Sequence, residues 1–161
     1  MFKNFLSKYI CKKEGVYICM KCGNQYFKKE LKKIKHKNSS IKIPIKEEIC
    51  CLSNTLNIDK LMAKTIFILN NKGYKTKYCC AGHKYNSFPD TYLFFEKPLE
   101  PHLKPIFMSY DTYEETKNNK ITKIEDYRVI RYYYNDKTNI QDKIKDINHR
   151  LLIWALELPS K

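Results

Sequence analysis

Two adjacent cysteines and a nearby histidine, Cys79, Cys80 and His83, are the side chains in this sequence best placed to do chemistry. A thiolate is a nucleophile, and a neighbouring imidazole lowers the pKa of a thiol, so Cys80 and His83 are candidate catalytic residues. Thiolates and imidazoles also bind metals, so this group could form a metal site together with Cys50 or Cys51. A third interpretation is structural, with both cysteines acting as small buried apolar residues.

The elements around this group read as two strands joined by a turn over residues 73–96. The flanking residues are β-branched or aromatic, types that fit a pleated surface; they are Thr76, Tyr78, Thr91, Tyr92, Phe94 and Phe95. Upstream, apolar residues recur with helical spacing over residues 54–71, and Gly73 is placed to end that helix in a left-handed conformation. We therefore expect a helix, a glycine turn and a strand that ends at the two cysteines.

The clearest strand covers residues 126–134 and contains two of the three arginines. Strict alternation places Arg131 on one face with Tyr127, Val129 and Tyr133, and Arg128 on the other face. If such a face is exposed, tyrosines interleaved with arginines suit stacking on unpaired bases, which makes Arg128 and Arg131 candidate nucleic-acid contacts. If helices cover the face, the tyrosines belong to the core.

The rest of the C-terminal region completes the expected α/β domain. Residues 106–110 read as a third strand, and residues 111–120 have helical and loop character. The acids Asp111, Glu114 and Glu115 there suit the first turn of a helix, or else a metal or proton-transfer site. Residues 139–158 have the apolar spacing of a long helix that ends before Pro159.

The turn and its neighbours resemble small proteins of low-GC Gram-positive bacteria and their phages. The residues that carry this resemblance are Ala63, Ile66, Leu69, Asn70, Lys72, Gly73, Tyr74, Thr76, Cys79, Cys80, Ala81, Gly82, His83, Thr91, Tyr92, Leu93, Leu152, Trp154, Ala155, Leu158 and Pro159. It implies a phage or mobile-element origin but no particular activity. The same turn is more distantly similar to that of tRNA wybutosine-synthesis methyltransferases, over less than a tenth of the chain.

Near the N-terminus, Cys19 and Cys22 form a Cys-x-x-Cys pair followed by Gly23. The motif resembles one knuckle of a zinc ribbon, in which a tight turn points two thiolates at one metal. A structural zinc site needs four ligands, and we take Cys11 and Cys50 as the other two, with His36 and Cys51 as alternatives. The competing interpretation is a ribbon remnant in which the metal has been lost.

Charge is concentrated in the same region. The net charge is +11 over residues 1–46 and +3 over residues 47–161, an asymmetry typical of a polyanion contact. The spacing of Phe27, Leu31 and Ile34 predicts a helix over residues 26–37. Its lysines would form a ridge that neutralises phosphates without reading base sequence, or a solvated face without a partner; they are Lys28, Lys29, Lys32, Lys33, Lys35 and Lys37.

Composition limits the class of protein. Hydrophobic residues make up 43% of the 161 residues, which indicates a folded core. No apolar run approaches the roughly 20 residues that span a bilayer, and no signal peptide is recognisable, so we expect a cytoplasmic protein, in the host cytoplasm if a phage encodes it. We expect an α+β fold, with a basic zinc-ribbon-like module in residues 1–46. Residues 47–161 would form an α/β sandwich with a mostly antiparallel sheet and a long C-terminal helix.

These features favour a non-enzymatic role over an enzymatic one. The sequence predicts a nucleic-acid-binding accessory protein of a phage or mobile element, one that grips a nucleic acid or nucleoprotein with its lysine-rich, zinc-stabilised module and interferes with a host nuclease system. The alternative is a metal- or Cys/His-dependent enzyme that acts on nucleic acid or a nucleotide, with Cys79, Cys80 and His83 as its active site.

Overall fold

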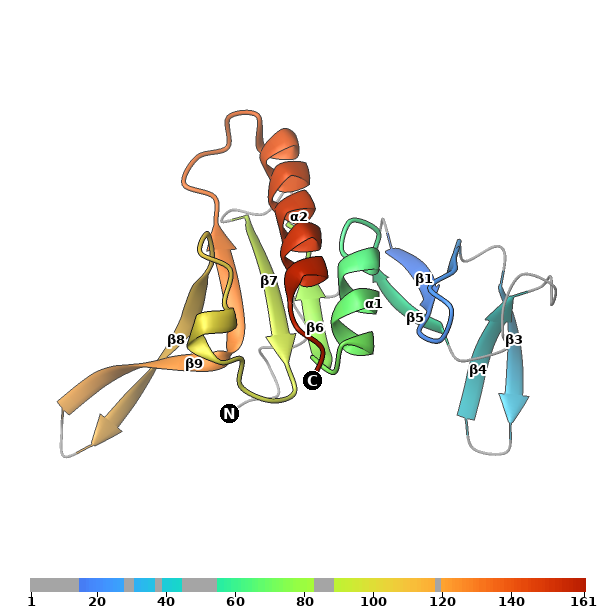
Figure 1. Ribbon diagram of the computed structural model, residues 1–161, viewed down its shortest axis with the longest axis horizontal. Coiled ribbons are helices and arrows are strands. Elements are labelled where there is room, and N and C mark those ends of the chain that lie inside the picture. The colour runs from blue at the N-terminus through green and yellow to red at the C-terminus, as the bar shows by residue number, and fades with distance from the viewer. Residues whose placement is uncertain (1–14, 28–30, 37–38, 45–54, 83–88, 118–119) are drawn as a thin grey trace. The chain divides into compact units, whose positions relative to one another are not determined.

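The computed structural model describes residues 15–27, 31–36, 39–44, 55–82, 89–117 and 120–161. The described part is α+β, with mostly antiparallel sheets and a C-terminal helix (Figure 1). The chain divides into two compact units, residues 1–67 and 68–161. The division falls within helix α1 (Ala63–Asn71), whereas the boundary expected after residue 46 follows the change in charge. Within the described ranges, no helix is long and apolar enough to cross a membrane.

The first unit contains a three-stranded antiparallel sheet in the order β2-β1-β5. Strand β1 (Gly15–Cys19) pairs with the short β2 (Gln25–Tyr26) on one side and with β5 (Thr55–Asp59) on the other. All residues of β1 after Gly15 are buried, as is Tyr26 of β2; the buried residues of β1 are Val16, Tyr17, Ile18 and Cys19. The apolar sequence of β1 therefore forms the centre of this small core.

The helix predicted over residues 54–71 is wrong in its first half. Residues Thr55–Asp59 form β5, and the helix begins only at Ala63. Asp59 separates the two elements, because its Oδ1 accepts a hydrogen bond from the backbone N–H of Leu61 at 3.1 Å and its carbonyl accepts one from Met62 at 3.0 Å. An aspartate that bonds the backbone two residues on makes a turn, which ends the strand before the helix starts.

The helix predicted over residues 26–37 is also wrong. Residues Leu31–His36 form strand β3, which pairs antiparallel with β4 (Ser39–Pro44) through six residue pairs. The pairing of the two strands outweighs the helical spacing of three apolar residues. Side chains along a strand alternate between its two faces with a period of two residues, whereas those of a helix repeat every 3.6 residues. The single helical face on which the lysine ridge was predicted is therefore absent from β3.

The second unit contains a four-stranded antiparallel sheet in the order β6-β7-β9-β8. Strands β6 (Thr76–Cys80) and β7 (Asp90–Phe95) confirm the pair predicted on either side of the cysteine turn. Gly73 precedes β6 with φ +92°, as expected for the residue that ends α1. Strand β9 (Lys120–Tyr133) confirms the predicted strand over residues 126–133 but begins six residues earlier.

Strand β8 (Ser109–Lys117) corrects two expectations. The third strand begins at Ser109 instead of Ile106, and the segment predicted as helix and loop is strand up to Lys117. Over Asp111–Lys117, β8 pairs only with the N-terminal half of β9, so the two form a hairpin that runs past the rest of the sheet (Figure 1). Its alternating threonines, tyrosine and glutamates suit a strand pair with both faces toward solvent.

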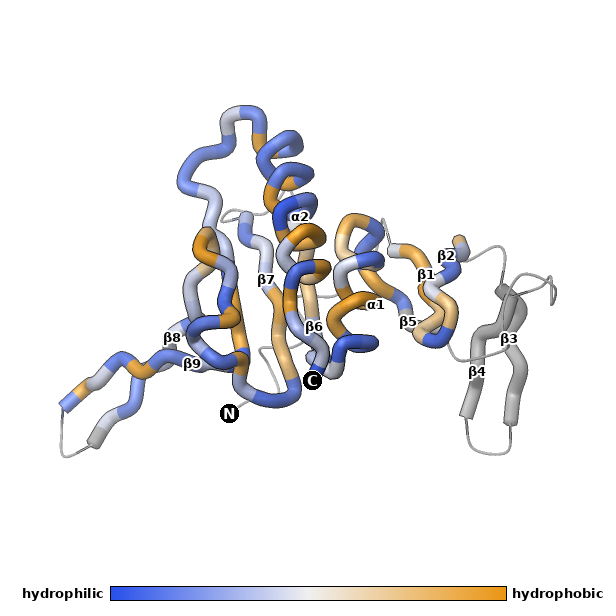
Figure 2. Tube along the Cα trace, in the orientation of Figure 1, coloured by the Kyte–Doolittle hydropathy of each residue, from blue (hydrophilic) through white to orange (hydrophobic). Residues whose placement is uncertain are grey.

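Helix α2 (Ile140–Glu157) confirms the predicted C-terminal helix and covers one face of this sheet (Figure 1). Hydrophobic residues recur along it in Figure 2, and its buried side chains include Ile144, Ile147 and Leu151. They share a core with Leu93 of β7 and Ile130 of β9, both fully buried. The ammonium of Lys72 donates to the carbonyl of Leu156 in the last turn of α2 and to that of Leu158 just after the helix.

Candidate nucleic-acid interface

The turn that follows β6 packs tightly against β7 and α2 of the second unit. Cys80 is buried, and its sulfur accepts a hydrogen bond from the backbone N–H of Gly82 at 3.4 Å. Gly82 has φ +95°, and a Cβ there would lie 3.1 Å from Thr91 Oγ1 and 3.2 Å from Ile144 Cγ1. Both the left-handed backbone and the close packing therefore require glycine at this position.

The carbonyl of Ala81 fastens this turn to two other elements. It accepts a hydrogen bond from Thr91 Oγ1 in β7 at 2.8 Å and one from Asn148 Nδ2 in α2 at 2.8 Å. Thr91 Oγ1 also bonds the hydroxyl of Tyr134 at 2.7 Å. Burial raises the pKa of Tyr134 to about 12, so the phenol stays protonated at neutral pH. We call Ala81, Thr91, Tyr134 and Asn148 the carbonyl latch.

These contacts describe a structural role for the turn. Cys79 is half-buried, Cys80 is buried, and His83 lies outside the described residues. The Cys80/His83 nucleophile and base therefore remains a prediction from the sequence. Of the two cysteines, Cys80 is the buried one, and a buried cysteine commonly serves as a small apolar residue of the core.

Cys19 is the last residue of β1, and Cys22 lies in the turn that joins β1 to β2. The backbone N–H of Gly23 donates to Cys19 O at 2.8 Å, and Cys19 N–H donates to Asn24 O at 2.9 Å. Gly23 has φ +79°, and Cys19 is buried while Cys22 is exposed. The described part of the chain gathers no group of three or more metal-binding side chains. Cys11 and Cys50 lie outside it, so the zinc site stays a prediction.

The lysines proposed as phosphate contacts are only partly described. Lys32, Lys33 and Lys35 lie in β3, while Lys28, Lys29 and Lys37 lie outside the described residues. Their spacing is no longer that of one helical face. Their number and the charge of residues 1–46 are unchanged, so a polyanion contact by these lysines stays a prediction from charge alone.

The four-stranded sheet carries aromatic rings and arginines on the face opposite α2. Thr91 and Leu93 of β7 are fully buried on the side of α2, so the intervening Tyr92 points to the other side. The register places Tyr78 of β6 opposite Phe94, and Arg131 of β9 opposite Tyr92. We call this surface the open face; it comprises Tyr78, Tyr92, Phe94, Arg128, Arg131 and Tyr133.

Rings on the open face are stacked and accessible. Tyr78 and Phe94 stack with ring centroids 5.6 Å apart and planes at 29°. Tyr78 is 46% exposed and Tyr133 56% exposed. The guanidinium carbon of Arg128 lies 5.5 Å from the Phe94 ring centroid, a cation–π distance.

A bulge in β9 places both arginines on the open face. Strict alternation predicts Arg128 and Arg131 on opposite faces, and this prediction is wrong. The register between β8 and β9 shifts from Tyr110↔Ile130 to Asp111↔Asp126, which leaves extra residues in β9 between the two pairs. A bulge of this kind re-aims the side chains next to it. Arg131 lies 5.0 Å from the Tyr92 ring while Arg128 lies over Phe94, on the same side of β7.

Both arginines are already paired with carboxylates. Arg131 bonds Asp90 and Asp111, and its side chain is only 15% exposed. Arg128 forms a two-pronged pair with Asp126 at 2.9 Å, and that hydrogen bond lowers the pKa of the Asp126 carboxyl. Two arginines thus face three aspartates, so the open face is close to neutral and presents stacking surface more than positive charge.

The aromatic half of the open face could not be identified as a site from the sequence. Tyr78, Tyr92 and Phe94 carry the signal of strand residues, and nothing local shows which strand they pair with. The relevant signal is their parity: Tyr92 and Phe94 share one face of a strand, as do Arg131 and Tyr133. The pairing of β7 with β9 that joins these sets is a long-range contact.

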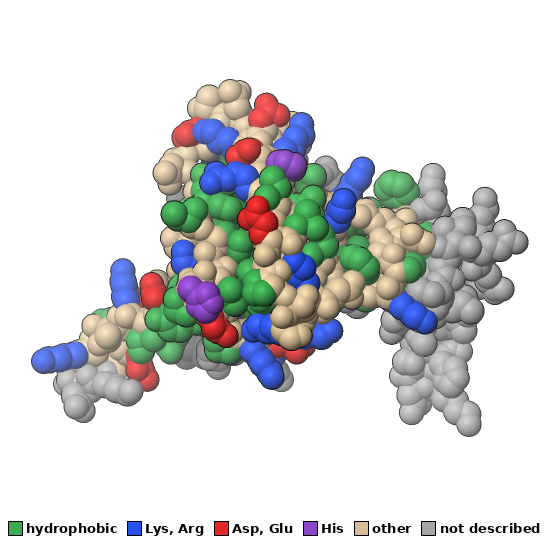
Figure 3. All heavy atoms as spheres, in the orientation of Figure 1, with side chains coloured by type: hydrophobic (Ala, Val, Ile, Leu, Met, Phe, Trp, Pro, Cys, Tyr) green, Lys and Arg blue, Asp and Glu red, His purple; other side chains and the backbone are tan. Residues whose placement is uncertain are grey.

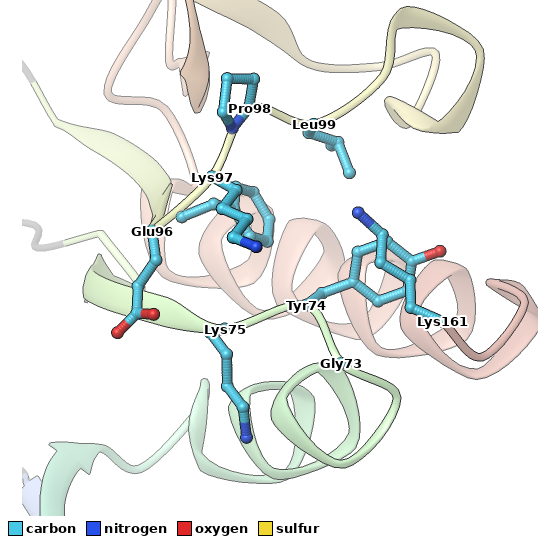
Figure 4. Close-up of a pocket in the computed structure, with 9 residues that line it drawn as sticks. Gly73, Tyr74, Lys75, Glu96, Lys97, Pro98, Leu99 and Lys161 are labelled. Carbon is cyan, nitrogen blue, oxygen red and sulfur yellow. The ribbon is translucent and has the colours of Figure 1, made fainter.

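A small cavity of about 250 Å³ lies elsewhere in the second unit (Figure 4). Its lining includes Tyr74, Glu96, Leu99 and the stem of Lys161, whose ammonium lies 4.6 Å from the Tyr74 ring. This volume is below the roughly 300–1,000 Å³ of ordinary ligand sites, and the charged residues of the lining are three lysines and one glutamate. We assign it no function.

Comparison of the chain with protein-family models, with curated proteins and with solved structures found no match. Function must therefore be argued from the described side chains themselves.

Proposed function

We propose that this protein binds nucleic acid and that the open face stacks on unpaired bases. The observation that carries the proposal is the accessible stack of Tyr78 on Phe94, flanked by the Arg128 guanidinium. Base–aromatic stacking contributes about 1–3 kcal/mol per base and tolerates any base, because every base has a π-face. Duplex DNA hides those faces inside its own stack, so the preferred ligand is single-stranded.

Charge and stacking are divided between the two ends of the sequence. The carboxylates of Asp90, Asp111 and Asp126 already hold the two arginines of the open face, which limits their use for phosphates. The lysines of residues 1–46, with a net charge of +11, supply the phosphate attraction. The affinity for nucleic acid should then fall as the salt concentration rises. The ring contacts should contribute a part of the binding free energy that salt leaves nearly unchanged.

We further propose that zinc stabilises the first unit through Cys19 and Cys22, with Cys11 and Cys50 completing the site. The β1–β5 register supports Cys50 as a ligand, since Thr55 lies opposite Cys19. Cys50 precedes Thr55 by five residues in the sequence, a span of at most about 18 Å of extended chain. This sequence distance allows Cys50 to join a site at the Cys19 turn. Bound zinc would hold the β1–β2 turn and add folding free energy to a small core.

The resemblance of the cysteine turn to phage proteins supports an accessory role in a phage or mobile element, acting in the host cytoplasm on nucleic acid or a nucleoprotein. We make no catalytic proposal for Cys80, because its sulfur is buried and takes part in the packing of the turn.

Binding of a fluorescently labelled oligothymidylate, measured by anisotropy with wild type and with Tyr78→Ala, tests the proposal. Loss of one stacking ring should raise the Kd by about 5- to 150-fold. Tyr78→Phe keeps the ring and is the matched control, with a Kd within about threefold of wild type. Tyr78 is half-exposed at a sheet edge, so neither change should disturb the fold.

A duplex of the same sequence should bind more weakly than the single strand. Its Kd should be the same for Tyr78→Ala and for wild type. The proposal for the open face is refuted if Tyr78→Ala binds the single strand as tightly as wild type does. If neither protein binds either ligand at low salt, the nucleic-acid function as a whole is refuted.

A further inference from the structure

The outer side of α2 carries an apolar patch close to its C-terminal end. Ile106, in the turn after the short helix Pro101–Leu103, is 96% exposed, and Ile153 of α2 is 43% exposed. With Phe107 and Trp154 they line a shallow groove of about 300 Å³. Figure 3 views the side on which α2 lies and shows hydrophobic side chains at the surface among charged ones. Such a cluster of exposed apolar side chains is typical of an interaction surface.

Two opposite charges flank this patch along the helix. Arg150 and Glu157 also line the groove, and they lie seven residues apart in α2, about two turns or 10.5 Å along the axis. They therefore share a side of the helix but are too far apart for an ion pair with each other. The Arg150 guanidinium lies 4.2 Å from the Phe107 ring, which fixes its position beside the patch.

This arrangement is complementary to itself under a two-fold axis. The midpoint between Arg150 and Glu157 falls between Ile153 and Trp154. If two α2 helices pack antiparallel about that midpoint, Arg150 of each copy faces Glu157 of the other, and the apolar residues meet at the centre. A two-fold interface requires that a surface complement its own copy, which an arbitrary partner site does not.

We infer that this patch is the interface of a homodimer, in which the antiparallel α2 helices bury Ile153 and Ile106 and form two Arg150–Glu157 ion pairs between copies. The partner is a second copy of this chain. The interface lies on α2, on the opposite side of the sheet from the open face, so dimerisation leaves both open faces available to ligand.

Sedimentation equilibrium of the full chain over a range of concentrations tests this inference. Wild type should show a reversible monomer–dimer equilibrium. Ile153→Lys should raise the dimer Kd by at least about tenfold, because the substitution appears twice in the interface. Ile121→Lys makes the same change at a residue of the β8–β9 hairpin that is 66% exposed, and it is the matched control that should leave the Kd unchanged.

Charge reversal tests the antiparallel geometry. Arg150→Glu and Glu157→Arg should each weaken the dimer, because each places like charges opposite one another. The double variant restores opposite charges and should recover most of the affinity. Circular dichroism of each variant verifies that α2 is folded.

A wild-type chain that stays monomeric at the highest concentration overturns the inference, and the patch would then belong to another segment of the chain or to another protein. A dimer that Ile153→Lys leaves intact, or a double reversal without recovery, overturns it equally.

Discussion

The carbonyl latch gives the sharpest quantitative expectation: Thr91→Val should destabilise the second unit although it changes almost no volume. Thr91 is fully buried, and its hydroxyl donates to Ala81 O at 2.8 Å. Because a threonine hydroxyl has only one proton, the 2.7 Å bond to Tyr134 must be donated by the tyrosine. Valine has the same shape as threonine but can neither donate nor accept.

The magnitude follows from the partners that remain. Ala81 O keeps its bond from Asn148, so only the net value of one hydrogen bond is lost there, about 1 kcal/mol. The Tyr134 hydroxyl, in a side chain only 8% exposed, is left without Thr91, which costs about 1–3 kcal/mol. A buried methyl in place of a hydroxyl returns about 0.8 kcal/mol. The expected loss in unfolding free energy is therefore about 1–3 kcal/mol.

Urea unfolding followed by tryptophan fluorescence measures this loss. Trp154 is the single tryptophan, and it lies in α2, where its Nε1–H donates to Leu103 O at 2.8 Å. Thr91→Val, Tyr134→Phe and the double variant form a cycle. The double variant should cost about 1–2 kcal/mol less than the sum of the singles, since Tyr134→Phe removes the stranded hydroxyl. A loss below about 0.5 kcal/mol for Thr91→Val, or strictly additive variants, would refute the latch.

Two further expectations concern pH and metal. Burial raises the pKa of Tyr134 to about 12 from the ordinary value near 10, so the stability contributed by its neutral phenol is complete below pH 10 and is lost as the pH rises from 10 to 12. The unfolding free energy from urea titrations should therefore fall more steeply with pH over that window for wild type than for Tyr134→Phe. Parallel pH dependences of the two proteins would contradict the assignment. Protein purified without chelator should contain about one zinc per chain by elemental analysis, with most of it lost in Cys22→Ser; metal-free wild type would rule out the zinc site.

Much of the second unit could be predicted from local sequence signals. The long apolar period of α2, the β-branched and aromatic runs of β6, β7 and β9, and the glycine at residue 73 each act over a few residues. Period, propensity and turn chemistry are properties of neighbouring residues, so a single sequence is sufficient to show them.

The errors occur where a distant partner decides the structure. Residues 31–36 have a helical spacing but pair with β4, and residues 55–59 continue the apolar pattern of α1 but pair with β1. Strand β8 exists because β9 lies beside it. In each case, pairing between strands outweighs a local preference worth less than about 1 kcal/mol per residue.

The candidate interface shows the same division. The sequence by itself determined that arginines alternate with tyrosines near residue 130, that the basic charge lies before residue 47, and that two cysteines precede a glycine turn. Only the tertiary structure decided that a bulge turns Arg128 to the side of Arg131, that Tyr78 and Phe94 stack beside them, and that three aspartates neutralise both arginines. These are contacts between strands far apart in the chain, and no period or propensity within one strand encodes them.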